Sequence, residues 1–191
     1  MSKIQNSNQY KFAEMKSSSY NTVDVKVGSF IRGWVIATYQ SDVVKIDKYS
    51  NLWGIVKQSL ELLPNDYHTI QDRSEYISFV LTKENTRSKV YNAETEKVYH
   101  SNSLYRCYIS EAGCHRIQRY LEKQFKAAFR TYMVGACGNN TEMSIQEGIT
   151  QFLLDYNLQE YIDKKMLGKL QKDWYRYRQN NPDTYSIPIF F

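Results

Sequence analysis

The sequence predicts an α+β fold in which an antiparallel meander sheet is covered by a long amphipathic helix and followed by a C-terminal helical hairpin. Three observations support this prediction. Residues 110–135 repeat apolar and basic side chains at helical spacing. Residues 74–110 contain four short runs rich in β-branched and aromatic residues, separated by links of hairpin length. Residues 144–180 show helical periodicity twice.

Composition predicts one globular domain with two flanking arms. The chain has 191 residues, of which 42% are hydrophobic and 15% aromatic, enough to bury a core without disulfides. We expect a flexible arm at 1–22, a single α+β domain at 23–180 and an apolar tail at 181–191. There is neither a signal-peptide pattern nor a run of about 18 apolar residues, so we expect a protein that is not secreted and not inserted into a membrane.

The N-terminal half is expected to begin with the polar arm, in which Tyr10 and Phe12 are isolated aromatic residues. Such an arm either frays or becomes ordered by docking on a neighbour. Residues 25–39 are apolar on both alternating sides, which predicts a buried strand. Residues 41–63 place leucine, isoleucine and valine at helical spacing, which predicts a helix that ends at Pro64.

Four strands are expected next, joined by short links in an antiparallel meander. They cover residues 74–82, 87–92, 96–100 and 103–110. The last strand leads directly into the long helix, so the apolar side of that helix is placed to cover the sheet.

The long helix is predicted to begin after Ser110, whose hydroxyl can cap it, and to stop at Gly135. Glu111 suits the positive end of the helix dipole. The helix has an apolar stripe on one face and a basic stripe on the other. The apolar stripe consists of Ile117, Leu121, Phe125, Ala128 and Tyr132, and the basic stripe of Arg116, Arg119, Lys123, Lys126 and Arg130. The basic stripe is either a set of contacts to phosphates or to an acidic partner, or a solvated helix face.

Two helices are expected near the C-terminal end. Ser144 and Glu147 form a capping-box pattern, and a break near residues 157–158 separates the two helices. The second helix could be the recognition helix of a helix-turn-helix or the basic side of a solvated hairpin. We favour the hairpin, because base reading needs Asn, Gln or Arg near the helix start and only lysines occur there. Its candidate phosphate or acidic-partner contacts are Lys165, Lys169, Lys172 and Arg176.

No catalytic, cofactor-binding or metal-ligating residue is predicted, and no cofactor is expected. The sequence has no P-loop, GxGxxG or HExxH motif. Cys107, Cys114 and Cys137 lack paired-ligand spacing, so we interpret them as small buried side chains. Cys114 and His115 are neighbours on a helix and therefore point apart. An enzyme would need a site assembled from residues distant in sequence.

The stretches EAGCHRIQRYLEKQFKAAFRTYM, ITQFLLDYNLQEY and DKKMLGKLQKDWYRYRQNN resemble the helical halves of small virion proteins of tailed, crAss-like phages. The resemblance covers residues 110–180 and includes no motif that transfers a functional residue. It implies a neck or tail subunit, such as a ring or connector protein, in the virion or in the host cytoplasm.

The leading hypothesis is a non-enzymatic structural subunit of a multi-protein assembly, a homo-oligomer that also contacts other assembly proteins. Its expected inter-subunit contacts are Tyr10, Phe12, Ile187, Ile189, Phe190 and Phe191. The alternative is a nucleic-acid-binding protein that uses the basic helices 111–134 and 163–179. The net charge of +5 is lower than that of a dedicated nucleic-acid coat protein.

Overall fold

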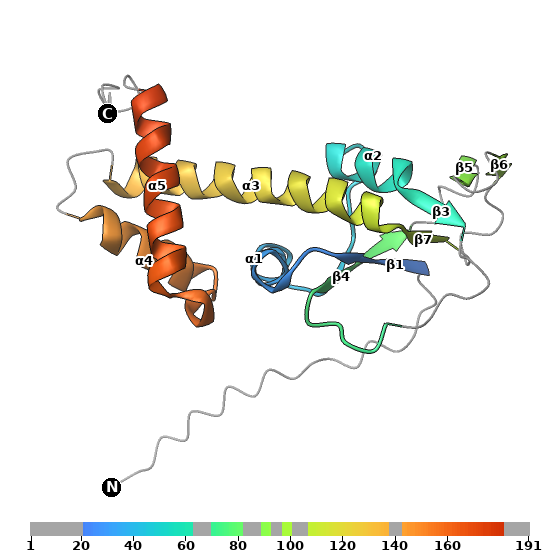
Figure 1. The fold of residues 1–191 in the computed structure, drawn as a ribbon, viewed down its shortest axis with the longest axis horizontal. Helices are drawn as coiled ribbons and strands as arrows, with labels where there is room; N and C mark the ends of the chain where they lie inside the picture. The colour runs from blue at the N-terminus through green and yellow to red at the C-terminus, as the bar shows by residue number, and fades with distance from the viewer. Residues whose placement is uncertain are drawn as a thin grey trace, which may run out of the picture.

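The protein is described by a computed structural model, which covers residues 21–62, 70–81, 89–92, 97–100, 107–137 and 143–181. The fold is α+β, as the sequence predicts. Helix α3 (Glu111–Cys137) is the longest element and runs through the molecule (Figure 1). The strands and two shorter helices pack along its N-terminal half, and two further helices pack at its C-terminal half.

The first described strand and helix correct the prediction of one strand over residues 25–39. Strand β1 (Asn21–Lys26) is followed by helix α1 (Ser29–Tyr39). Gly28 lies between them with φ 77° and ψ 151°, a conformation that essentially only glycine adopts without strain. The apolar residues after Gly28 therefore pack as a helix, in which Ile31, Trp34 and Val35 are buried.

The prediction of one helix over residues 41–63 is right only for the middle of that segment. Helix α2 (Asn51–Gln58) is capped by the Ser50 hydroxyl, which accepts a hydrogen bond from the Trp53 amide at 3.1 Å. Short strands flank it, β2 (Val43–Val44) before and β3 (Leu60–Leu62) after. Leu60, which continues the helical spacing, is therefore buried as part of strand β3.

The described strands do not form the expected meander. Strand β4 (Tyr76–Leu81) lies between β1, which is antiparallel to it, and β2, which is parallel. Strand β7 (Cys107–Ile109) pairs with β3. Only β5 (Lys89–Asn92) and β6 (Lys97–His100) form the hairpin that their short link predicts. Both edges of β4 are thus paired with strands that precede it in the sequence. The lengths of the links between consecutive strands, on which the meander prediction rests, contain no information about this pairing.

Helix α3 begins as expected and ends later than expected. The Gly113 amide donates to the Ser110 hydroxyl at 3.4 Å, which confirms the N-cap. Gly135 does not stop the helix, because the helix continues to Cys137 and Gly28 is the only described glycine with positive φ. The buried stripe contains Ile117, Leu121, Phe125, Phe129 and Met133. Ala128 and Tyr132 of the predicted stripe are half-buried beside it.

Helices α4 (Ile145–Asp155) and α5 (Lys164–Asn180) contact each other and confirm the two C-terminal helices. The predicted capping box is present: the Ser144 hydroxyl accepts from the Glu147 amide, and the Glu147 carboxylate accepts from the Ser144 amide. The predicted break is confirmed by Asn157, which has φ 53°, and by a short 3-10 helix at Gln159–Tyr161. Leu170 and Trp174 are the buried residues of α5, and they pack this helix against the rest of the fold.

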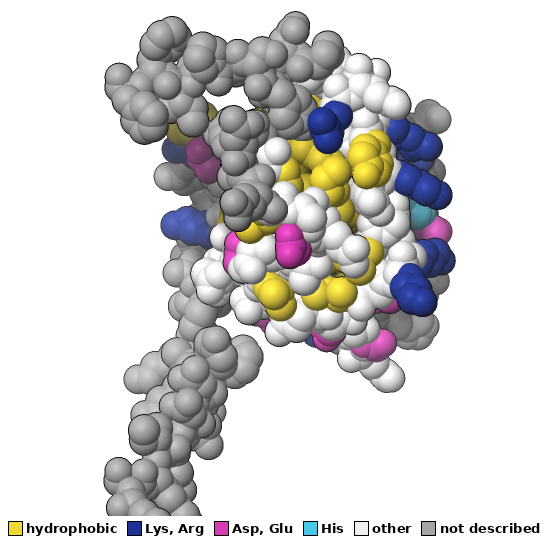
Figure 2. Space-filling view, turned by 90° about the vertical axis from the view of Figure 1, so that its left-hand side faces the viewer, with side chains coloured by type: hydrophobic (Ala, Val, Ile, Leu, Met, Phe, Trp, Pro, Cys, Tyr) yellow, Lys and Arg dark blue, Asp and Glu magenta, His cyan; other side chains and the backbone are white. Residues whose placement is uncertain are grey.

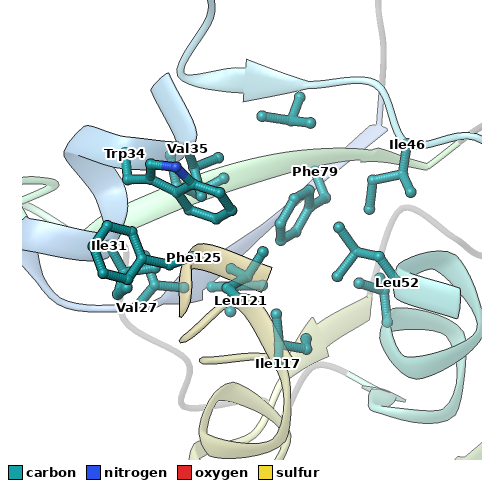
Figure 3. Close-up of a cluster of buried hydrophobic side chains, with 14 of the residues drawn as sticks. Val27, Ile31, Trp34, Val35, Ile46, Leu52, Phe79, Ile117, Leu121 and Phe125 are labelled. Carbon is teal, nitrogen blue, oxygen red and sulfur yellow. The ribbon is translucent and has the colours of Figure 1, made fainter. Parts of the chain in front are cut away.

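One continuous core joins these elements. Figure 3 shows its centre, where Ile117, Leu121 and Phe125 of α3 point toward Trp34 of α1 and Phe79 of β4. The Trp34 and Phe125 rings meet edge to face with centroids 5.7 Å apart. The core therefore fixes α1 and the sheet on one side of α3.

Candidate interaction surfaces

The basic stripe of α3 is exposed at four of its five predicted positions. Arg119, Lys123 and Lys126 are exposed, and so is Arg116, whose guanidinium also donates to the Ser59 hydroxyl at 3.3 Å. Arg130 is half-buried and forms a bidentate ion pair with Asp173 of α5, at 2.9 and 2.8 Å. The hydrogen bond to Asp173 raises the pKa of Arg130 above its usual value. Arg130 therefore joins α3 to α5.

The different position of Arg130 follows from the geometry of the buried stripe. The buried residues of α3 recur every four positions. Four residues of a helix turn through about 400°, so the buried face rotates by about 40° at each step. From Ile117 to Met133 this rotation brings the packing face round toward the basic side. The predicted basic stripe alternates spacings of three and four residues, which keep it on one side of the helix. It therefore does not account for the rotation of the buried face.

Helix α5 presents its predicted basic residues on one exposed face. Lys165, Lys169, Lys172 and Arg176 are all exposed and are separated by four, three and four positions. The opposite face holds Trp174, whose ring stacks on Tyr177 at 5.8 Å. Trp174 and Tyr177 thus lie on the core side, whereas Tyr175 is 45% exposed, so the arginine-aromatic alternation forms no flat platform for bases.

A groove lies between α1, α3 and α5, with a cavity volume of about 430 Å³. We call it the α1–α3–α5 groove. Its lining includes the predicted contacts Lys126, Lys169 and Arg176, so the two basic helices meet at one feature. Glu75, Glu122 and Asp173 also line it. Its apolar residues are Val27, Phe30, Ile31, Phe125, Met166 and Leu170.

The charges along the α1–α3–α5 groove are not balanced. Asp173 is neutralised by Arg130, and Glu75 by Lys26 at 3.1 Å. Lys126, Lys169 and Arg176 form no ion pair with any residue that the structure describes. The groove therefore combines an apolar lining with surplus positive charge on the two helices that border it.

A second surface lies at the end of the molecule formed by α4 and α5. Figure 2 shows hydrophobic side chains gathered on this end, with lysine and arginine side chains along one border. Leu154 of α4 and Tyr175 of α5 are 44% and 45% exposed. We call this surface the α4–α5 face. Both residues lie more than about 100° away from the buried stripe of their own helix, and this offset is the sequence signal that indicates their exposure.

The cysteines occupy inert environments. Cys114 is buried; the Lys26 amide donates to its sulfur at 3.4 Å. Burial raises the pKa of Cys107, Cys114 and Cys137, which disfavours the reactive thiolate. His115 points to the surface, 3.7 Å from the Glu111 carboxylate. A cavity of about 580 Å³ adjoins Cys114 and His115 and shares Gly28 and Glu75 with the α1–α3–α5 groove.

The described part of the chain contains no group of three or more histidine, cysteine or acidic side chains that could hold a metal ion. None of its helices combines the length and apolar character needed to cross a bilayer. The predicted terminal contacts, Tyr10, Phe12, Ile187, Ile189, Phe190 and Phe191, lie outside the described residues.

No family model matches the chain, and no curated protein or solved structure matches it either. Function is therefore argued from the geometry of the described residues.

Proposed function

We propose that the chain is a non-enzymatic structural subunit of a multi-protein assembly, and that its α4–α5 face packs against a second copy of the chain. The observations that support this are the gathering of hydrophobic side chains on that face in Figure 2 and the exposure of two large apolar residues on its helices, Leu154 of α4 and Tyr175 of α5. Single exposed apolar residues are common, but a patch with a charged border is typical of a protein interface.

The segment 187–191 is the part of the second copy that best fits this face. Its sequence, IPIFF, is wholly apolar, and it follows α5 after a short link. Six extended residues span roughly 20 Å, comparable with the roughly 25 Å length of α5 itself. A neighbour whose α4–α5 face lies within that distance of the end of α5 would be within reach of the segment. Repeating this head-to-tail contact closes a ring when the rotation between copies allows it.

The resemblance of residues 110–180 to small phage virion proteins extends the proposal. A ring of this kind would be a neck or tail component, either a ring or a connector protein. It would work through contacts with its own copies and with adjoining assembly proteins.

The α4–α5 face is tested by placing a charge on it. In the double variant Leu154→Lys, Tyr175→Lys the oligomer should dissociate, because the contact would remove water from each lysine ammonium group. The matched control is Tyr39→Lys with Tyr49→Lys, since those tyrosines are exposed on other elements. Light scattering after size exclusion reports the mass, and far-ultraviolet circular dichroism checks the fold. Equal masses for the two double variants would contradict the role of this face.

The role of the tail is tested separately by deleting residues 187–191. We expect the deletion to abolish assembly and to leave a folded monomer, with light scattering reporting the mass and far-ultraviolet circular dichroism checking the fold. An oligomer of unchanged mass would show that these five residues do not make the contact.

A further inference from the structure

The α1–α3–α5 groove has the shape and the lining of a site for apolar anchors. Its volume of about 430 Å³ falls in the range of ligand-binding clefts. Val27 and Ile31 line it from the α1 side, and Met166 and Leu170 line it from α5. Met166 is only half-buried, so part of the apolar lining is open to solvent.

The charges at its border select for acidic groups. Lys126 lies on α3, and Lys169 and Arg176 lie on α5. Lys123, Lys165 and Lys172 continue the positive charge along the exposed faces of the same two helices. Among the described residues, the half-buried Glu122 is the one lining carboxylate without a cationic partner, and it accepts a hydrogen bond from the Gln118 side-chain amide at 3.0 Å.

The start of α1 adds to this preference. Gly28, Ser29 and Phe30 line the groove, and α1 has no side chain that caps its first turn and no acidic residue in it. The amide groups of a first helical turn carry partial positive charge. A carboxylate in the groove would thus meet both the helix end and the cations.

From the apolar lining and the surplus positive charge together, we infer that the α1–α3–α5 groove binds an acidic amphipathic segment of a partner protein. The apolar side chains of that segment occupy the groove, and its acidic side chains meet Lys126, Lys169 and Arg176. This is the helix-in-groove mode of peptide recognition, with electrostatic complementarity setting the choice of partner. The inference concerns a different surface from the α4–α5 face and does not depend on self-assembly.

Single-stranded nucleic acid is the competing ligand for a basic groove, and the aromatic rings disfavour it. Base stacking needs open ring faces. Phe125 is 4% exposed and is packed edge to face with Phe30 at 5.0 Å. Phe30 also meets Tyr161 edge to face, at 5.4 Å. These rings are therefore engaged with one another, whereas aliphatic anchors need only the apolar lining.

The test uses two fluorescein-labelled helical peptides that share one leucine stripe. In one peptide all polar positions are glutamate, and in the other they are lysine. Fluorescence anisotropy with the full-length protein should show that the glutamate peptide binds roughly tenfold or more tightly than the lysine peptide, with an affinity that falls as salt is raised. Met166→Gln should weaken binding of the glutamate peptide, because it places a polar amide in the lining.

Charge reversal assigns the binding to the groove. The triple variant Lys126→Glu, Lys169→Glu and Arg176→Glu should no longer bind the glutamate peptide. The control variant Lys45→Glu, Lys57→Glu and Lys164→Glu makes the same change in net charge at exposed positions that do not line the groove, and should bind as the wild type does. The oligomer mass of both variants is recorded, so a failure of assembly is distinguished from a failure of the groove.

Three results would overturn the inference. The first is no preference of the wild type for the glutamate peptide. The second is equal loss of binding in the groove variant and the control variant. The third is binding of an oligothymidine probe to the wild type but not to the groove variant, together with displacement of the peptide by that probe. This result would assign the groove to nucleic acid.

Discussion

Tyr132 lies where the C-terminal half of α3 packs against α4. Its ring meets Phe152 at 5.2 Å, and its hydroxyl donates a hydrogen bond to the Asp155 carboxylate at 2.9 Å. Partial burial, followed by the hydrogen bond and the charge of Asp155, raises the pKa of Tyr132 to about 12. The neutral phenol is thus part of the contact between the two helices.

This shift predicts how stability changes at alkaline pH. The folded pKa exceeds the unfolded value of about 10, so the folded state holds the proton more tightly. The contribution of Tyr132 is complete below about pH 10 and is lost as the pH rises toward about 12. Urea unfolding across this range should therefore show a steeper loss of stability for the wild type than for Tyr132→Phe. Parallel stability profiles for the two proteins would contradict the assignment.

At the residue scale the sequence predicts exposure better than pairing. Arg116, Arg119, Lys123 and Lys126 are exposed as expected. The helical periodicity groups Arg130 with them, yet its partner Asp173 lies 43 residues away on another helix. A periodic pattern within one helix contains no information about which helix packs across it, so this ion pair could not be predicted.

At the scale of elements, two helical glycines report how closely the elements pack. A Cβ on Gly113, in the first turn of α3, would lie 2.7 Å from Ile109 Cγ2 and 3.0 Å from Ser59 Cβ. A Cβ on Gly168, within α5, would meet no atom within 4 Å. Gly113 therefore allows a close approach between α3 and the β3–β7 side of the fold, whereas Gly168 has no such role.

The two positions should respond to alanine with opposite signs. Gly113→Ala should lower the free energy of unfolding by about 1–3 kcal/mol, the cost of overpacking a tight contact. Gly168→Ala should raise it by up to about 1 kcal/mol, because alanine favours a helix over glycine. Urea titrations at neutral pH measure both changes. If Gly113→Ala were as stable as Gly168→Ala, the close packing at the start of α3 would be wrong.

Elements with clear caps and one apolar side could be predicted from sequence, and the others could not. The periodic apolar residues predict helices α3, α4 and α5, and Ser110 and Ser144 predict where α3 and α4 begin. The segment after β1 is apolar on every side, so its period does not separate strand from helix. The positive φ at Gly28 ends the strand there. The pairing of β4 with β1 and β2 is non-local and depends on packing against α3.

At the scale of the whole molecule, α3 joins two groups of elements. Its first half contacts β1, β7, α1 and α2, and it also contacts α4 and α5 (Figure 1). The two groups also meet directly, because the Tyr161 hydroxyl donates to the Ser29 carbonyl at 3.1 Å beside the start of α1. The α1–α3–α5 groove lies along this junction.

The α+β class and the membership of Lys126, Lys169 and Arg176 in basic helices could be predicted from sequence. Their convergence on one groove could not, since it depends on the packing of α5 near α1. The α4–α5 face also could not be predicted, because it exists only once α4 and α5 lie side by side in the folded chain. The terminal contacts remain predictions.

The central claim, that this chain is an assembly subunit, is tested most directly by the mass of the full-length protein in solution. Size exclusion with light scattering and the ultraviolet absorbance ratio of the peak measure mass and nucleic-acid content together. The account predicts a defined oligomer, a multiple of the 22.6 kDa chain, free of nucleic acid. A monomer at every concentration, or a monomer that carries nucleic acid, would contradict it.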